Sequence, residues 1–337
     1  MTDALRWFMD DIGHLTNNQL ECINQKHSED YNVYSDDIEL QEQFFKRMPY
    51  CNINSETHGI RFGKCATDLI KELFHEYGQD SLIITTYFEH DNVNKILNEH
   101  PNVYKIRYNS DLNELKKYIL DKEYKKIFVY IIGTQISTGE IAPTSFLIRL
   151  KQILETINVE YIFTLDAVQE MFLIPRDYRI FDYIIGTGHS LVMKYDIGMV
   201  LYNRKNKEFG YVYNDLAKEY LKHLDIVLSK KDSLLYYKFA MKEMFKDVVD
   251  NKLFSIVKDS TPQIFSIRVD KSFKMPESII NKIKDYYIYF DGFDNDNADY
   301  SYIRIRWQQV IAEPEKIYNG ILLLKRYLSE LKEIANE

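Results

Sequence analysis

The fold class follows from two neighbouring stretches, YIFTLDAVQ at residues 161–169 and FDYIIGTGHSLVMKYDIGMVLY at residues 181–202. Each begins with a short apolar run rich in β-branched and aromatic residues, which is typical of a strand buried inside a sheet. The first run ends at an acid, Asp166, and the second ends at a glycine-containing turn, residues 187–190. We therefore predict two buried strands that each end in polar side chains.

Similar apolar runs recur upstream of these stretches, at residues 81–86, 103–108 and 127–132. Helical patterns lie between the runs, at residues 67–75, 92–97, 112–120 and 144–157. Strands that alternate with helices form a mostly parallel sheet with helices on both faces. The sequence thus predicts an α/β domain over residues 50–205, and sheets of this kind bind ligands at the carboxyl ends of their strands.

The last third of the chain has a different pattern. Its first part is strongly helical, strands are expected at residues 263–269 and 303–307, and an amphipathic helix is expected at residues 314–331. We interpret residues 206–337 as a second, smaller α+β domain, and we expect the N-terminal segment, residues 1–49, to join it.

Composition excludes several classes of protein. Hydrophobic residues make up 45% and charged residues 28% of the 337-residue chain, which is ordinary for a globular protein. No run approaches the roughly 20 apolar residues of a membrane helix, and the first thirty residues lack a signal-peptide core. The net charge of −8 argues against nucleic acid or an anionic membrane as partner. Three cysteines without CxxC spacing fit a reducing cytoplasm.

Motifs of other enzyme classes are missing from the sequence. It contains no G-x-G-x-x-G motif and no P-loop, so a dinucleotide or nucleotide site has no support. The eight histidines show no metal-ligand spacing, so we predict no metal site. A G-x-S-x-G nucleophile elbow is also absent, so Ser190 does not lie in a hydrolase motif.

Asp166 is the first candidate for chemistry. A carboxylate at the end of a central strand can pair with a protonated ring nitrogen and keep that nitrogen charged, which makes the ring an electron sink. The alternative is an aspartate that only caps the helix after the strand.

In order and spacing, the two stretches resemble the cysteine desulfurases (class V aminotransferases) and the group II amino-acid decarboxylases. These families of the pyridoxal-phosphate (PLP) enzymes of fold type I read D-A-x-Q, a strand, S-G-H-K, a glycine-rich turn and another strand. The resemblance implies that Asp166 pairs with the pyridinium nitrogen and that Gln169 bonds the ring hydroxyl. It also implies that Thr187 and His189 bind the phosphate.

Upstream segments extend the resemblance to about residues 55–330. The strand that ends in Glu89 and His90 resembles one whose histidine stacks on the cofactor ring, although His90 could also be an ordinary capping or surface histidine. The segment FGKCATDLI, residues 62–70, resembles a phosphate loop and places Ala66 and Thr67 at a helix N-terminus. A competing alignment sets residues 54–58 against an earlier family motif.

Two further segments fit the same families. Residues 131–134 and 138–141 resemble the strand and turn that flank the cofactor ring. Near the end of the chain, the segment YIRIR at residues 302–306 resembles V-R-x-S, whose arginine grips a substrate carboxylate. The resemblance therefore implies substrate binding by Arg304, and the alternative is an arginine on a surface strand.

Ser190 occupies the position of the Schiff-base lysine, and serine cannot form an imine. Three interpretations remain open. The chain binds PLP or pyridoxamine phosphate without a covalent bond and does altered chemistry, for which His189 is adjacent to position 190. Alternatively, Lys194 replaces the lysine from four residues downstream, a span of at most about 14 Å. In the third interpretation, the fold is kept as a noncatalytic binding or scaffold protein. The sequence by itself does not distinguish a natural serine from an engineered one.

These observations lead to one expectation. We predict a fold type I PLP-transferase architecture that acts on an amino acid or an amino-acid-derived small molecule without the usual lysine. The alternative is a pseudoenzyme that binds a ligand or a partner. The resemblance also implies a homodimer, because the sites of these families lie at a subunit interface.

Overall fold

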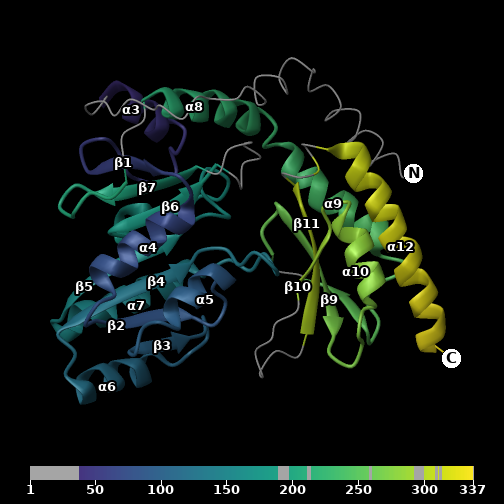
Figure 1. Cartoon of the computed structure of the whole chain (residues 1–337), viewed down its shortest axis with the longest axis horizontal. Coiled ribbons are helices and arrows are strands. Elements are labelled where there is room, and N and C mark those ends of the chain that lie inside the picture. Colours follow the sequence, from purple (N-terminus) through teal and green to yellow (C-terminus); the bar gives the residue numbers. More distant parts are fainter. Residues whose placement is uncertain are drawn as a thin grey trace. The chain divides into compact units, whose positions relative to one another are not determined.

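The computed structural model describes residues 38–188, 197–210, 214–257, 260–291, 300–307, 310 and 313–336. The described chain forms two compact units, each with a sheet and helices of its own (Figure 1). The large unit contains residues 38–135 and 142–228, and the small unit contains residues 136–141 and 229–336. The short segment 136–141 therefore leaves the large unit and returns to it at Ala142.

Seven strands form the sheet of the large unit in the order β1-β7-β6-β5-β4-β2-β3. They are β1 (His58–Gly63), β2 (Leu82–Thr86), β3 (Val103–Ile106), β4 (Lys126–Ile132), β5 (Glu160–Asp166), β6 (Tyr183–Thr187) and β7 (Gly198–Asn203). Strand β7 is antiparallel to both its neighbours, and the other neighbouring pairs are parallel. The predicted mostly parallel sheet is confirmed, and the parallel pairing of β5 with β6 brings the ends of both strands to one edge.

Helices cover this sheet because each has an apolar face. They are α3 (Ile38–Lys46), α4 (Ala66–Tyr77), α5 (Asp91–Leu97), α6 (Leu112–Lys122), α7 (Thr144–Ile157) and α8 (Asn214–Ser229), with a short 3-10 helix at Tyr178–Ile180. On α4, Leu69 and Phe74 are buried and pack in one cluster with Phe128 and Tyr130 of β4. Because side chains alternate along a strand, Phe128 and Tyr130 lie on the face of β4 that is turned toward α4.

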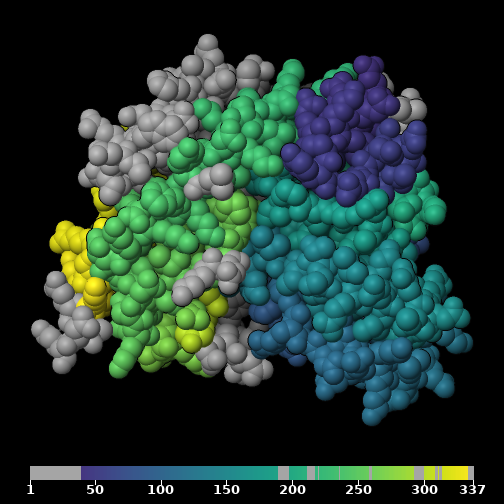
Figure 2. All heavy atoms as spheres, turned by 180° about the vertical axis from the view of Figure 1, so that it is seen from behind, coloured from purple at the N-terminus to yellow at the C-terminus, as the bar shows by residue number. Residues whose placement is uncertain are grey.

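Helix α8 belongs to the large unit up to Leu228, beyond the boundary expected after residue 205. It packs on α3, where the rings of Phe44 and Tyr220 lie 5.6 Å apart and Arg47 forms an ion pair with Asp225. Figure 2 shows the purple atoms of α3 beside green atoms of the chain. The described part of the N-terminal segment thus packs on the large unit, although the sequence had assigned residues 1–49 to the small domain. Residues 1–37 lie outside the described chain.

Strand β1 was not expected from the sequence, because HGIRFG has two glycines and only two strongly apolar residues. It forms because it pairs antiparallel with all of β7. Gly59 makes this pairing possible, since a Cβ atom there would lie 2.3 Å from the ring of Tyr202. A strand that depends on one neighbour in this way carries little periodicity of its own.

The small unit has a four-stranded antiparallel sheet in the order β10-β11-β9-β8. Its elements are α9 (Ser233–Phe245), β8 (Phe254–Ile256), β9 (Ile264–Asp270), α10 (Glu277–Lys284), β10 (Tyr289–Asp291), β11 (Tyr300–Arg306) and α12 (Pro314–Asn336). Alternate residues of β9 and β11, such as Ile267 and Ile303, are buried apolar side chains. Phe265 lies on the same side of β9 as Ile267 and stacks on Phe245 of α9. The polar side chains of the two strands therefore lie on the opposite face.

Among the described residues, no helix combines the length and the apolar content that crossing a bilayer requires.

Candidate functional site

Asp166 ends β5, and its side chain is buried, with 5% of its surface exposed. The hydroxyl of Tyr130 donates a hydrogen bond to Asp166 Oδ2 (2.7 Å), and the backbone N–H of Val168 donates to Oδ1 (3.0 Å). Tyr130 is in register with Thr164, two residues before Asp166, so the two side chains lie on the same face of the sheet. The fold thus presents an acid at the strand end.

Burial raises the pKa of Asp166, and the two hydrogen bonds oppose that rise. His90 also lowers the pKa of Asp166, with a smaller effect than the two hydrogen bonds. Within the described chain, the donors to Asp166 are a hydroxyl and a backbone amide, and no lysine or arginine pairs with it. A buried carboxylate without a cation fits a ligand that supplies one.

Glu89 is a second buried acid at this edge, with 4% of its surface exposed. Its Oε1 accepts hydrogen bonds from the backbone N–H (3.2 Å) and the hydroxyl (2.6 Å) of Thr86. The backbone N–H of Ile132 also donates to Oε1, at 3.2 Å, and Ile132 is in register with Asp166. Burial raises the pKa of Glu89 to about 8, and the charge of Asp166 contributes to that rise. The sequence contained Glu89 beside His90 but assigned it no role.

His90 is exposed and is the N-cap residue of α5. Its Nδ1 accepts a hydrogen bond from the backbone N–H of Asn92 (3.2 Å), which assigns the remaining proton of a neutral ring to Nε2. The described hydrogen bond of His90 is thus a helix-capping contact. Stacking on a cofactor ring stays a prediction.

The first turn of α4 approaches the start of β7 closely. A Cβ atom on Gly198 would lie 2.4 Å from the carbonyl carbon of Cys65 and 2.6 Å from the nitrogen of Ala66. Gly198 is paired with Thr187, whose side chain is buried and donates to the carbonyl of Ile197 (3.1 Å). The fold therefore brings the end of β6 to the start of α4.

The start of α4 is where the sequence predicted a phosphate loop. Ala66 is buried, Thr67 is half-buried, and the N-cap residue Cys65 makes no side-chain capping hydrogen bond. The first N–H groups of a helix have no partner within the helix and attract anions such as phosphate. Phosphate binding by these residues stays a prediction, and so does the competing alignment at residues 54–58, where Asn54 closes a turn before β1.

The remaining predicted residues of the large unit divide into two groups. Gln169 is buried in the turn after β5, three residues beyond Asp166. His189, Ser190 and Lys194 lie outside the described residues.

A buried ion pair supports the turn after β4. Nε of Arg176 donates to Glu170 Oε1 (2.5 Å), Nη2 donates to Oε2 (3.1 Å), and both side chains are almost fully buried. Thr134 donates to the same carboxylate at 2.8 Å, and Arg176 also donates to the carbonyl of Ala142 at 3.0 Å. These bonds fix both ends of the excursion that residues 136–141 make into the small unit.

Arg304 and Arg306 lie on the polar face of β11 in the small unit. Arg304 forms an ion pair with Asp291 through Nε, and its guanidinium carbon lies 4.6 Å from the centre of the Tyr289 ring. Burial lowers the pKa of Arg306 to about 10, and the charge of Arg304 adds to that effect. Arg306 therefore remains a cation at neutral pH. Arg304 is 9% exposed, and substrate binding by it stays a prediction.

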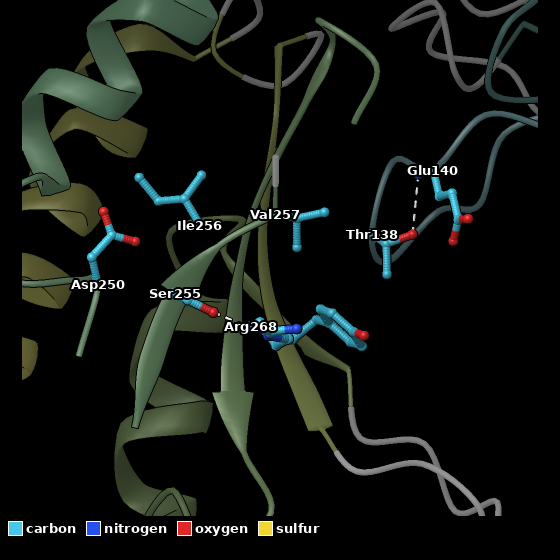
Figure 3. A pocket seen from close by; sticks show the side chains of 8 residues that line it. Thr138, Glu140, Asp250, Ser255, Ile256, Val257 and Arg268 are labelled. Carbon is cyan, nitrogen blue, oxygen red and sulfur yellow. Dashed lines mark hydrogen bonds between the residues drawn. The ribbon is translucent and has the colours of Figure 1, made fainter. Parts of the chain in front are cut away.

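A cleft of about 520 Å³ opens on the same unit (Figure 3). Its lining residues are Thr138, Glu140, Asp250, Ser255, Ile256, Val257, Arg268 and Tyr302. Nε of Arg268 donates to the hydroxyl of Ser255 (3.0 Å), and its guanidinium lies 4.3 Å from the centre of the Tyr300 ring. The sequence had not singled out Arg268, because nothing in the linear pattern brings it beside β8 and β11.

In the part of the chain that the structure describes, no three His, Cys, Asp or Glu side chains gather as metal ligands would.

Comparison with known proteins finds likeness in structure alone. No protein-family model and no curated protein sequence matches the chain. Solved structures do match over nearly the whole length. A NifS-like protein is 18% identical, with a TM-score of 0.64, over 93% of this chain and 96% of its own. The ureidoglycine-glyoxylate aminotransferase of Bacillus subtilis is 12% identical, with a TM-score of 0.61, over 94% and 90%.

A third similar structure is the serine palmitoyltransferase of S. paucimobilis with bound PLP-myriocin aldimine. It is 14% identical, with a TM-score of 0.62, over 95% of this chain and 84% of its own. At these identities the likeness shows the fold. The chain has the α/β architecture of the fold type I PLP enzymes, as the resemblance of its motifs implied.

Proposed function

We propose that the large unit binds PLP or pyridoxamine phosphate without a covalent bond and that the protein acts on an amino acid or an amino-acid-derived metabolite. The observation that carries this proposal is Asp166, a buried carboxylate at the carboxyl end of a central strand without a cationic partner among the described residues. Two further observations support it: the fold of the similar structures, and the close approach of Gly198 to the start of α4.

The residues present fit such a cofactor. Asp166 would hold the proton on the ring nitrogen, and Tyr130 would keep the carboxylate oriented toward it. The first turn of α4, with Ala66 and Thr67, and the end of β6 at Thr187 would hold the phosphate. When bound, PLP supplies an electron sink for bonds at the α-carbon of an amino acid.

Three further assignments come from the resemblance. Gln169 would bond the ring hydroxyl, His90 would pack against the ring, and Arg304 would bind the carboxylate of the substrate. Ser190 would leave the cofactor without a covalent link, with His189 beside it. A homodimer that completes the site belongs to the same proposal.

Binding of the cofactor tests the proposal directly. Titration calorimetry with PLP and with pyridoxamine phosphate should show saturable binding, which Asp166→Asn weakens about 10- to 100-fold, because a charge-assisted hydrogen bond contributes about 1.5–3 kcal/mol. Asp121→Asn, an exposed aspartate on α6, is the matched control and should bind normally. If neither form of the cofactor binds, the enzyme proposal fails.

The serine at position 190 favours the second candidate, a noncatalytic PLP-fold protein that binds a ligand or a partner. The two candidates differ at positions 190 and 194. Ser190→Lys should turn yellow with PLP, and borohydride should fix the cofactor to residue 190 alone. In the unchanged protein we expect no stoichiometric adduct at Lys194, and an adduct that Lys194→Ala abolishes would contradict this. A folded Ser190→Lys variant that binds PLP without such an adduct would refute the motif alignment.

A further inference from the structure

Glu89 is a buried acid that the proposed chemistry does not use. It follows β2, and its carboxyl joins the ends of two strands, because Thr86 of β2 and Ile132 of β4 both donate to it. All three of its hydrogen bonds reach the same oxygen, Oε1. The other oxygen, Oε2, is buried and has no hydrogen-bond partner within the described chain.

This arrangement is unfavourable for an ionised carboxylate. Each oxygen of a carboxylate carries negative charge and needs donors when it is removed from water. One-sided donation leaves half of that charge without a partner, whereas a carboxylic acid accepts at Oε1 and carries its proton on Oε2. The neighbourhood adds to the cost, because Asp166 is a second acid at the same edge.

The charged and titratable groups around the pair are few. Asp166 is the charged group that raises the pKa of Glu89, and the charges of both acids raise the pKa of Tyr130. His90 and Glu170 act on Asp166, and Glu170 is already paired with Arg176. In the described chain, therefore, no lysine or arginine stands beside either Glu89 or Asp166 to favour two negative charges.

We propose that Glu89 keeps its proton at neutral pH, so that Glu89 and Asp166 together carry one negative charge and form a receptor for a single heterocyclic ring cation. Asp166 pairs with the cation, and Glu89 is a positioning residue that acts through Asp166. With Glu89 neutral, the cation and Asp166 neutralise each other, and the buried assembly has no net charge. With Glu89 ionised, one negative charge would remain uncompensated in an apolar site.

The protonation part of this inference concerns the protein alone, and the receptor part rests on the proposed function. Infrared spectroscopy of the cofactor-free protein tests the first part. The wild type should show the carbonyl stretch of a buried carboxylic acid at pH 7, and the band should disappear as the pH rises through about 8. Glu89→Gln should lack the band, and the exposed control Glu99→Gln should retain it.

Two results would overturn the protonation part. A wild-type spectrum without the band at pH 7 would show that Glu89 is ionised. A band that persists in Glu89→Gln and is lost in Asp166→Asn would place the proton on Asp166.

The receptor part is tested by PLP affinity in two variants. Glu89→Ala should weaken PLP binding about tenfold, because the ends of β2 and β4 lose their shared acceptor beside Asp166. Glu89→Gln should restore most of the affinity, because its amide presents a neutral group of the same shape. If Glu89→Gln folds normally and binds as weakly as Glu89→Ala, a negative charge at position 89 is required and the receptor part is wrong. If the wild type does not bind PLP, the proposed function fails, and the infrared result still decides the protonation.

Discussion

The strand ends of the large unit and the polar sheet face of the small unit both bury ionisable side chains, but they meet the cost of burial differently. Glu89 and Asp166 lack cationic partners in the described chain, and burial raises the pKa of both. Arg304 and Arg306 lie against the ring of Tyr289, and Asp291 forms an ion pair with Arg304. A carboxyl can take up a proton near neutral pH, whereas a guanidinium cannot lose one.

The difference suggests what each region can accept. A pair of buried acids that share one negative charge can neutralise a single cation without leaving a second charge in the site. A guanidinium that aromatic rings and one aspartate already hold in place offers a fixed positive charge.

The largest expected effect concerns Arg176, which forms a two-point ion pair with the buried carboxylate of Glu170. Arg176→Ala should lower the free energy of unfolding by about 3–5 kcal/mol, because it leaves Glu170 charged and buried without its partner. Denaturant unfolding measures this, with Arg149→Ala, an exposed position on α7, as control. A loss below about 1 kcal/mol would mean that the ion pair between Arg176 and Glu170 contributes little to stability.

The next largest effect is the pH dependence that Glu89 imposes. Its pKa rises from 4.5 in the unfolded chain to about 8 in the folded protein, so the folded state binds more protons between these values. Stability from this group is therefore complete below pH 4.5 and is lost as the pH rises toward 8. Each pKa unit of this shift corresponds to about 1.4 kcal/mol, so we expect a loss of at most about 5 kcal/mol across this window.

Denaturant unfolding at several pH values separates this contribution. Glu89→Gln should remove the slope that belongs to Glu89, and Glu99→Gln should leave the wild-type slope unchanged. A slope between pH 5 and 8 that is equal in the wild type and Glu89→Gln would assign the titration to another group.

A smaller effect is expected for Tyr130. Tyr130→Phe removes the hydroxyl that donates to Asp166, so it should raise the pKa of Asp166 further and cost about 1–2 kcal/mol at neutral pH. Because a raised pKa means that ionisation destabilises the fold, this cost should shrink as the pH falls and Asp166 becomes protonated. Unfolding at neutral and acidic pH measures both effects, and Tyr50→Phe, at a position 65% exposed, is the control. An equal cost at both pH values would mean that packing alone explains the loss.

The smallest effect is expected for the ion pair of the small unit. Arg304→Gln should cost about 1 kcal/mol or less, because the Asp291 side chain keeps 25% of its surface exposed and water can solvate it. Arg326→Gln, which removes an ion pair whose side chains are 81% and 57% exposed, gives the scale for comparison in the same unfolding measurements. If Arg304→Gln costs as much as Arg176→Ala, the two units do not differ in the way proposed here.

The sequence determined the architecture of the large unit. The runs that became β2, β4, β5 and β6 are apolar and short, because strands in a mostly parallel sheet are covered on both faces. Periodicity alone thus located the helices between them and the acid at the end of β5. Strand β1 was not predicted, because it is stabilised by pairing with β7, and this pairing leaves no pattern in the local sequence.

Tertiary structure decided the ionisation of the candidate site. The sequence named Asp166 from its place after a strand, but the pKa of that acid depends on Tyr130, His90 and the depth of burial. Glu89 had no predicted role, because its partners come from the ends of two strands that are neighbours in space and far apart along the chain. Desolvation depends on what surrounds a group in three dimensions, so only the folded chain shows which acids remain charged.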